Sequence, residues 1–354
     1  MSEEIKSQRK ILLCGYFAFG TSDNGGQPVK SRETYWALCN KYGKGNVHYV
    51  ETLGWKKHPL KLFISFFKQA KRHDYIIMLP AHHGLMIFSR MLMIARKLNN
   101  KKIYYSVIGG WLPTILKEKA RLKKILQKFD GIFVETSSMY DALICEGFNN
   151  VHTVPNFKSL PMLSVNDVNI HFKKPYPLCM FSRIMQEKGV EDAINAVIKI
   201  NTNAGEVVYT LNLFGQIDSG YKEHFEKLMK TFPEYIRYRG IILANESVAT
   251  IKNYFALLFP THYYTEGIPG TLIDACTAGV PVITSLWLNY KDVFVEGKTG
   301  WGYEFGKNEL LQTLLEEATE NPVAFYSMRE SALKEAEKYR PNAVVEIIDG
   351  LFDI

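Results

Sequence analysis

Short apolar runs alternate with amphipathic stretches along the chain. In the first half the apolar runs predict strands at 11–17, 47–50, 75–79, 102–107, 131–134 and 151–154. The stretches between them predict helices at 31–42, 59–70, 86–98, 114–128 and 137–146. The strands are apolar throughout, as expected when helices cover both faces of a sheet. The alternation therefore predicts an α/β fold with a parallel sheet.

The pattern stops between residues 156 and 177, where prolines and small polar residues show no period, and then restarts. This break is typical of a linker between domains. Strands are predicted after it at 178–181, 208–214, 235–238, 256–259, 280–284 and 300–303. Helices are predicted at 190–200, 221–231, 248–254, 271–278, 309–320, 324–339 and 343–352, the last two separated at Pro341. We therefore expect two domains, residues 1–156 and 157–339.

Composition supports two packed domains and limits the classes of partner and the cellular compartment that are expected. The chain has 354 residues, 47% hydrophobic and 22% charged, with a net charge of +7. That charge is modest, and no motif suggests nucleic-acid binding. Five scattered cysteines without a CxxC pair fit reduced thiols in the cytoplasm. The N-terminus has no signal-peptide core, and the most apolar stretch, 85–95, is too short to cross a bilayer. A soluble or membrane-surface protein is expected.

The loop after strand 256–259 carries the clearest candidate chemistry. Glu266 opens a turn rich in Gly and Pro, and Asp274 lies in the helix that follows. The free amides of that helix end favour an anion, and Gly267 and Gly270 allow close backbone approach. Two carboxylates can accept hydrogen bonds from vicinal hydroxyls, so the loop fits a nucleotide sugar. Taken singly, Glu266 is equally well a surface charge and Asp274 a partner of the helix dipole.

Two further loops supply groups suited to phosphate. After strand 178–181, Arg183 and Lys188 bracket a turn that leads into a helix, an arrangement that fits a diphosphate. The alternative is a pair of solvated surface cations. After strand 11–17, Gly25 and Gly26 precede a helix but form neither a dinucleotide-binding fingerprint nor a P-loop.

Together these motifs resemble the family-4 retaining glycosyltransferases, which have the GT-B fold of two Rossmann-like domains facing each other across a cleft. The resemblance covers nearly the whole chain and is strongest from Phe181 to Gly300. Glu266 and Asp274 resemble the two acids of the family's EX7E element, although Asp274 is one methylene shorter than the usual Glu. Gly215 and the segment from Ala278 to Ile283 resemble two further family elements, and residues 287–300 resemble capsule and lipopolysaccharide sugar transferases.

The resemblance implies a role for each residue. Arg183 and Lys188 would hold the donor diphosphate, Glu266 the donor sugar and Asp274 the ribose. The remaining donor contacts would come from Gly25, Gly26, Gly215, Gly267, Ile268, Pro269, Gly270 and Thr271. The expected reaction is hexosyl transfer from a nucleoside diphosphate sugar with retention of configuration, without metal or other cofactor. The family's architecture also implies that a C-terminal helix, about residues 340–354, packs back on the first domain.

The acceptor side would lie in the first domain. His82 and His83 follow a predicted strand and are candidates to line it, whereas Trp111 is either core or a platform for a sugar. The family implies a glycan or lipid-linked saccharide acceptor and a role in polysaccharide biosynthesis. The stretch 60–72 mixes large apolar residues with lysines. It fits either a helix lying in an anionic membrane surface, at the inner face of the cell membrane, or a core helix with a solvated basic face.

Other functions of the same fold remain open. A nucleotide-sugar epimerase would need a different set of acids and His in the cleft. A phosphorylase would need a pyridoxal phosphate lysine and a much longer chain. A non-catalytic module that binds nucleotide sugars is disfavoured by the presence of both Glu266 and Arg183.

Overall fold

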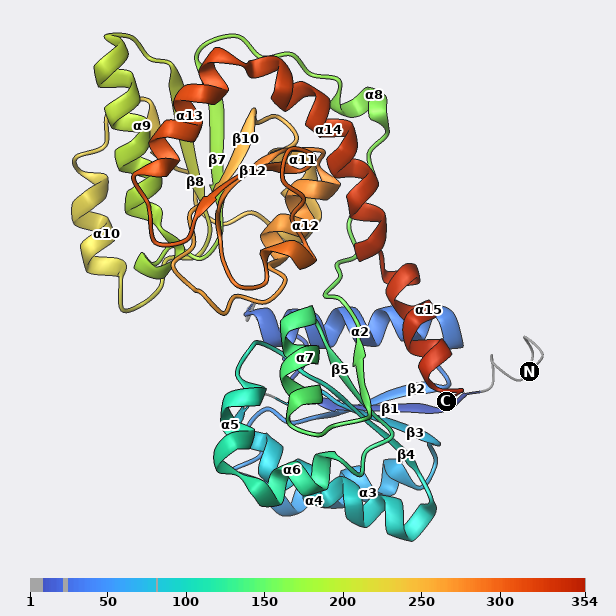
Figure 1. Cartoon of the computed structure of the whole chain (residues 1–354). Coiled ribbons are helices and arrows are strands. Elements are labelled where there is room, and N and C mark those ends of the chain that lie inside the picture. The colour runs from blue at the N-terminus through green and yellow to red at the C-terminus, as the bar shows by residue number, and fades with distance from the viewer. Residues whose placement is uncertain (1–8, 22–24, 81, 354) are drawn as a thin grey trace. The chain divides into compact units, whose positions relative to one another are not determined.

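The computed structural model describes residues 9–21, 25–80 and 82–353 (Figure 1). The chain divides into two compact units. Unit 1 comprises Met1–Ser159 and Tyr339–Ile354, and unit 2 comprises Leu160–Lys338. The chain therefore passes from unit 1 into unit 2 and returns to unit 1 near its end.

Unit 1 is built on a six-stranded parallel sheet in the order β2-β1-β3-β4-β5-β6. The strands are β1 Ile11–Gly15, β2 Val47–Glu51, β3 Tyr75–Met78, β4 Lys102–Ser106, β5 Gly131–Val134 and β6 Val151–Thr153. The strand order reverses between the neighbours β1 and β3. In open parallel sheets, ligands bind beyond the carboxyl ends of the strands at such a reversal.

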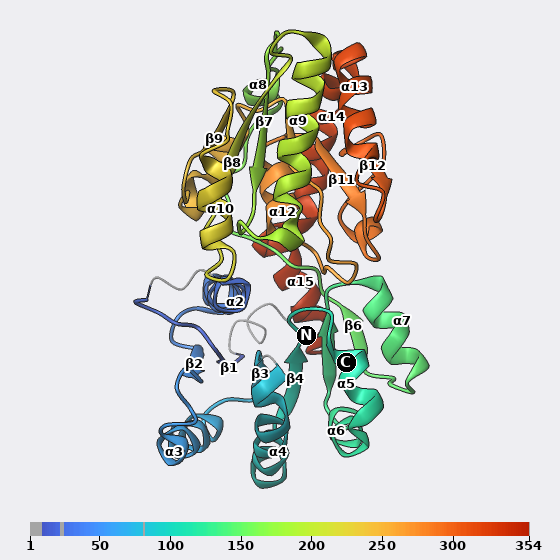
Figure 2. The same ribbon diagram turned by 90° about the vertical axis from the view of Figure 1, so that its left-hand side faces the viewer.

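Helices cover both faces of the unit 1 sheet. One face packs on α3 Pro59–Ala70, α4 His82–Asn99, α5 Leu112–Glu118, α6 Ala120–Leu126 and α7 Ser137–Cys145. Figure 2 shows α3, α4 and α6 on the same side of the strands. The other face packs on α2 Gly26–Tyr42 and α15 Pro341–Leu351.

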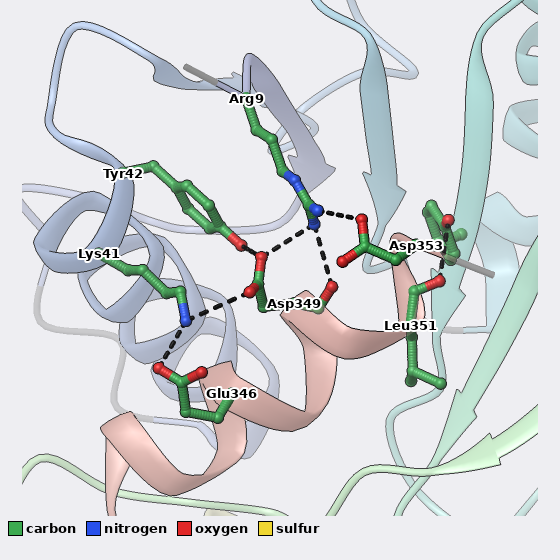
Figure 3. A network of polar contacts seen from close by, with 8 residues as sticks. Arg9, Lys41, Tyr42, Glu346, Asp349, Leu351 and Asp353 are labelled. Atoms are coloured by element: carbon green, nitrogen blue, oxygen red, sulfur yellow. Dashed lines mark hydrogen bonds and ion pairs between the residues drawn. The ribbon is translucent and has the colours of Figure 1, made fainter. Parts of the chain in front are cut away.

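A buried ion network fixes α15 to the start of unit 1 (Figure 3). The Asp349 carboxylate accepts hydrogen bonds from Arg9 Nη1, at 2.8 Å, and from the Tyr42 hydroxyl. Arg9 also donates to the backbone oxygen of Asp349, at 3.0 Å, and pairs with Asp353. The side chains of Arg9 and Asp349 are each only 3% exposed. The end of the chain is therefore held by charges that are removed from water.

Unit 2 contains a second six-stranded parallel sheet, in the order β12-β11-β10-β7-β8-β9. The strands are β7 Tyr176–Phe181, β8 Tyr209–Phe214, β9 Ile236–Tyr238, β10 Ala256–Phe259, β11 Val282–Leu286 and β12 Gly300–Glu304. The helices are α8 Val165–Val168, α9 Val190–Ala204, α10 Lys222–Met229, α11 Ser247–Ile251, α12 Gly270–Thr277, α13 Leu310–Glu320 and α14 Pro322–Ala336. Short 3-10 turns lie at Gln186–Lys188, Ala244–Glu246, Tyr290–Asp292 and Glu337–Tyr339. The strand order reverses between β7 and β10.

The twelve predicted strands are confirmed, with ends that differ by a few residues at most. The single helix predicted at 114–128 is wrong, because the chain breaks at Lys119 (φ −120°, ψ 66°) into α5 and α6. In one continuous helix Leu122 would be rotated about 240° from Leu116. The break instead lets both leucines reach the core, where each is only 1% exposed. In the segment predicted as a linker, the structure has one short helix, α8.

Candidate functional site

The reversal of strand order in unit 2 places two of the predicted loops beside each other. β7 and β10 are paired, with Leu178 opposite Ala256 and Cys179 opposite Leu257. The loop after β7 carries Arg183 and Lys188, and the loop after β10 carries Glu266. Both loops leave the carboxyl edge of the sheet, so their polar side chains can act on one ligand.

Close backbone contact joins these two loops. Gly189 has a φ of +71°, and a Cβ atom added to it would lie 1.9 Å from the backbone oxygen of Pro260. The backbone N–H of His262 donates to the Glu187 oxygen at 2.9 Å, and its ring hydrogen-bonds to the Asp192 carboxylate. Only glycine fits at position 189, and the loops are held together as one surface.

Lys188 and Glu266 form an ion pair at the centre of that surface. Their side chains are 15% and 19% exposed, so both are largely shielded from water. The Lys188 ammonium also lies over the rings of Phe259 and Tyr263, with Nζ 5.4 and 5.0 Å from the ring centroids. The lysine is therefore positioned by three neighbours, and a bound anion would meet an oriented cation.

Arg183 is more exposed than Lys188 and belongs to the same neighbourhood. Its Nη1 lies 3.6 Å from Oδ2 of Asp218, and the two side chains are 49% and 31% exposed. Burial raises the pKa of the Tyr263 hydroxyl; Glu187 and Glu266 raise it further, whereas Arg183 lowers it. Arg183 and Glu266 thus act electrostatically on the same phenol, and the guanidinium keeps exposed donors for a ligand.

Gly215 supports the strand end beside Arg183. It has a φ of +139°, and an added Cβ would lie 1.8 Å from the backbone oxygen of Ser182. Its N–H donates to the Gly240 oxygen at 2.9 Å, and its oxygen accepts from the Tyr238 hydroxyl at 2.8 Å. A glycine is required here because the ends of β7 and β8 approach so closely.

The start of α12 has the properties of an anion site. Pro269 precedes the helix, no side chain caps it and its first turn holds no acid. Thr271 Oγ1 is buried and has no hydrogen-bond partner among the residues that the structure describes. Buried hydroxyls are nearly always satisfied, so this one indicates a missing acceptor. The loop before the helix is ordered, since Ile268 is buried and Asn289 donates to the Glu266 backbone oxygen.

Asp274 lies deeper than a surface carboxylate. It is 1% exposed, and its Oδ1 accepts a hydrogen bond from Ser247 Oγ at 2.8 Å. Ser247 opens α11 and was not a candidate from sequence, because nothing local in the chain links it to Asp274. The ribose contact expected of Asp274 stays a prediction, and it would require the carboxylate to share or exchange this partner.

The candidates of unit 1 lie in the segments that follow β1, β3 and β4. Gly25 and Gly26 form the start of α2, which has no side-chain cap and no acid in its first turn. His82 and His83 open α4, but their side chains are outside the described residues. Trp111 is half-buried against the core, and its Nε1 donates to the Ile108 oxygen at 2.7 Å. Trp111 thus contributes to packing; its contact with a sugar stays a prediction.

A buried ion pair at the carboxyl edge of the unit 1 sheet was not predicted from the sequence. Lys30 and Glu135 pair with side chains that are 8% and 10% exposed, and Lys30 Nζ also donates to the Val107 oxygen at 3.3 Å. Val107 and Glu135 follow β4 and β5, so the pair lies at the carboxyl edge of the sheet. The partners are 105 residues apart, and no local pattern joins them.

The described residues contain neither a cluster of metal-ligating side chains nor a helix that could span a membrane. No three His, Cys, Asp or Glu side chains in the ranges 9–21, 25–80 and 82–353 are grouped as metal ligands. Within the same ranges, no helix combines the length and apolar character needed to span a bilayer.

The groups assembled in the loops of unit 2 are two cations, one paired carboxylate, an uncapped helix and an unsatisfied hydroxyl. They can bind an anion that also carries hydroxyl groups.

The chain is similar in sequence to known glycosyltransferases. Residues 166–339 match the family "Glycosyl transferases group 1". An uncharacterized glycosyltransferase of Methanocaldococcus jannaschii is 23% identical over 189 residues, which cover 50% of this chain and 46% of that protein. The chain thus spans about half the length of this curated relative.

Two solved structures are similar over almost the whole chain. HepE of Anabaena, in complex with UDP and glucose, has a TM-score of 0.72 at 13% identity, covering 98% of this chain and all of HepE. The lipopolysaccharide outer core galactosyltransferase WaaB, in its apo form, has a TM-score of 0.68 at 17% identity, covering 97% of this chain and 99% of WaaB. The predicted fold is confirmed: the chain has the GT-B fold.

Proposed function

We propose that this protein transfers a hexosyl group from a nucleoside diphosphate sugar to a hydroxyl of a glycan or lipid-linked saccharide, with retention of configuration. The observation that carries the proposal is the Lys188–Glu266 ion pair beside the uncapped start of α12, where Thr271 has an unsatisfied hydroxyl. A sugar diphosphate offers acceptors for the cations and the hydroxyl, and donors for the carboxylate. The family match at 166–339 covers these same residues.

Each side chain has a distinct role in this proposal. Arg183 and Lys188 bind the diphosphate and stabilise the negative charge that develops as the anomeric C–O bond breaks. The start of α12 and Thr271 bind the distal phosphate, and Glu266 accepts from hydroxyls of the donor sugar. Asp274 binds the ribose.

The Lys188–Glu266 ion pair balances the charge of the donor site when no donor is bound. An isolated cation with 15% exposure would be costly, and Glu266 offsets that cost when no donor is bound. When the diphosphate arrives, Lys188 exchanges the carboxylate for phosphate oxygens. Glu266 is then released toward the sugar hydroxyls.

The transfer itself needs no resident cofactor in this scheme. The electron pair of the broken anomeric bond leaves with the nucleoside diphosphate. The acceptor oxygen bonds to the anomeric carbon on the same face, and its proton passes to the departing phosphate oxygen. Cations and helix amides supply the stabilisation that a metal ion gives elsewhere.

The likeness to HepE favours a uridine nucleotide, and the likeness to WaaB favours a role in polysaccharide biosynthesis. HepE was crystallised with UDP and glucose, and WaaB is a lipopolysaccharide galactosyltransferase. Both are similar to this chain along nearly their full length. UDP-glucose and UDP-galactose are therefore the first donors to test.

A thermal-shift screen of UDP-, GDP-, ADP- and CMP-sugars tests the donor class directly. A ligand that binds only the native state raises its stability by about 2.7 kcal/mol at 100 times its Kd, so the cognate donor should stand out. The stabilised mixture is then assayed for nucleoside diphosphate release with candidate acceptors. Absence of any shift, or conversion to an epimer without release of nucleotide, would contradict the proposal.

A further inference from the structure

The positive charge of the protein is concentrated in one part of unit 1. Residues 52–117 contain twelve Lys and Arg but a single acid, Asp74, whereas the net charge of the whole chain is only +7. The rest of the chain is therefore net acidic. This segment includes α3 and α4, which cover the same face of the unit 1 sheet (Figure 2).

α3 exposes aliphatic side chains together with unpaired cations. Leu60 and Ile64 are 77% and 70% exposed, one turn apart on the outer side of the helix. Its opposite side buries Leu62, Phe66 and Ala70 in the core. The exposed cations Lys61, Lys68, Lys71 and Arg72 form no ion pair with any residue in the described part of the chain. Solvated surface helices rarely combine both features.

α4 presents a matching outer stripe. Ile87, Ile94 and Leu98 are 37%, 51% and 68% exposed. The exposed cations Arg90 and Lys97 lie between them on the same side of the helix, and the helix sequence contains no acid. Two helices of one layer therefore expose aliphatic tips among cations.

The surface of α3 is also hollowed. A groove of about 540 Å³ is lined by Phe63, Ile64, Phe67, Lys68, Lys71 and Arg72. These residues lie along one side of the helix, and the lining is apolar toward the start of α3 and cationic at its end. The groove lies in unit 1, whereas the donor loops lie in unit 2, so it belongs to a different function from donor binding.

We infer that the outer face of α3 and α4 docks on an anionic phospholipid bilayer. Leu60, Ile64, Ile94 and Leu98 would enter the boundary between head groups and acyl chains. Lysine and arginine stems would extend along the apolar surface while their charges meet lipid phosphates. Several cations on an amphipathic helix without acids are the charge pattern that such lipids bind.

The structure favours α3 and α4 over the basic stretch at 114–128. In α6, Lys123 pairs with Glu146 at 2.7 Å, which partly neutralises its charge. In α5, Glu118 follows Lys117 directly. Neither α5 nor α6 is among the helices with exposed large aliphatic residues in the described chain. The alternative left open by the sequence, a solvated basic face, does not account for Leu60 and Ile64.

Co-sedimentation with vesicles tests this inference. The full-length protein is mixed with vesicles of phosphatidylcholine alone, or with vesicles in which a third of the lipid is phosphatidylglycerol. Binding is expected only to the anionic vesicles and should weaken as salt is raised. Replacing Lys61, Lys68, Lys71 and Arg72 with Gln should weaken binding on the order of 100-fold or more, at about fivefold per cation.

Matched variants test whether vesicle binding depends on this surface or on the total charge of the protein. Leu60→Ser with Ile64→Ser should also reduce binding severalfold, although no charge changes. Replacing Lys222, Lys227, Lys334 and Lys338 with Gln removes the same charge from unit 2, where each lysine pairs with an acid. That variant should bind like the wild type.

The inference would be overturned by no binding of wild type to anionic vesicles, or by equal loss of binding in the α3 and unit 2 lysine variants. Equal binding to neutral and anionic vesicles would also reject it, because charge would then have no role. Donor binding, read by thermal shift, should be unchanged in every α3 variant. Membrane docking and donor binding can therefore fail independently of each other.

Discussion

Replacing Asp349 with Asn should destabilise unit 1 by several kcal/mol. The substitution keeps the shape of the side chain but removes a charge that Arg9, Tyr42 and Lys41 share, the last with Nζ at 3.5 Å (Figure 3). Arg9 would stay buried with Asp353 as its remaining carboxylate. Losing one partner of a buried pair costs about 3–5 kcal/mol. Because Asp353 still faces Arg9, we expect about 3 kcal/mol, the lower end of that range.

Thermal unfolding followed by circular dichroism and by proteolysis of the C-terminal segment measures the effect. For a domain of 150–250 residues, 3 kcal/mol lowers the Tm of its transition by roughly 6–12 °C. Glu346→Gln is the control, because Glu346 belongs to the same network but its side chain is 69% exposed. That change should cost under about 1 kcal/mol. Equal Tm values for the two variants would refute the idea that buried charge anchors α15.

Three further predictions concern the donor loops, metal and pH. Gly189→Ala should lower the free energy of unfolding by about 1–3 kcal/mol and displace Lys188, because the added Cβ would meet Pro260. The control Gly205→Ala, at a similar φ of +66° in open space, should leave donor binding intact, and equal donor affinity in the two variants would count against the tight loop contact. EDTA should leave the transfer rate unchanged, and a rate restored only by added Mg²⁺ or Mn²⁺ would show that cations of the chain are insufficient. Burial lowers the pKa of His73, so below about pH 6.5 the unfolded state binds more protons than the folded state, and the free energy of unfolding should fall as the pH falls. In urea titrations His73→Asn should show a weaker dependence of this free energy on pH than wild type, and equal dependence in the two proteins would reject the reasoning.

The strands were predictable because each is a short run rich in apolar residues between polar turns, although polar residues such as His48 in β2 and Arg237 in β9 interrupt some of them. Reversal of strand order is not visible in such runs, yet it decides that the loops after β7 and β10 meet. The sequence therefore indicated Lys188 and Glu266 as candidates, and only the fold shows them as a pair.

Partners distant in the chain could not be predicted from local pattern. Ser247 and Asp274, and likewise His262 and Asp192, meet only after the sheet has formed. The break at Lys119 illustrates a different limit, because helix propensity continues through it while packing demands a change of register. A check of which leucines share one helical face would have revealed that break.

The most direct test of the central claim compares Glu266→Gln with Glu187→Gln in nucleoside diphosphate release from the donor identified by thermal shift. Glu266 pairs with Lys188, whereas Glu187 is the exposed neighbour of that lysine. We expect kcat/KM to fall by about 100-fold or more in Glu266→Gln, because an oriented group at the reacting sugar is lost. Glu187→Gln should retain wild-type activity. If Glu266→Gln turned over the donor as fast as wild type, the site would lie elsewhere in the molecule.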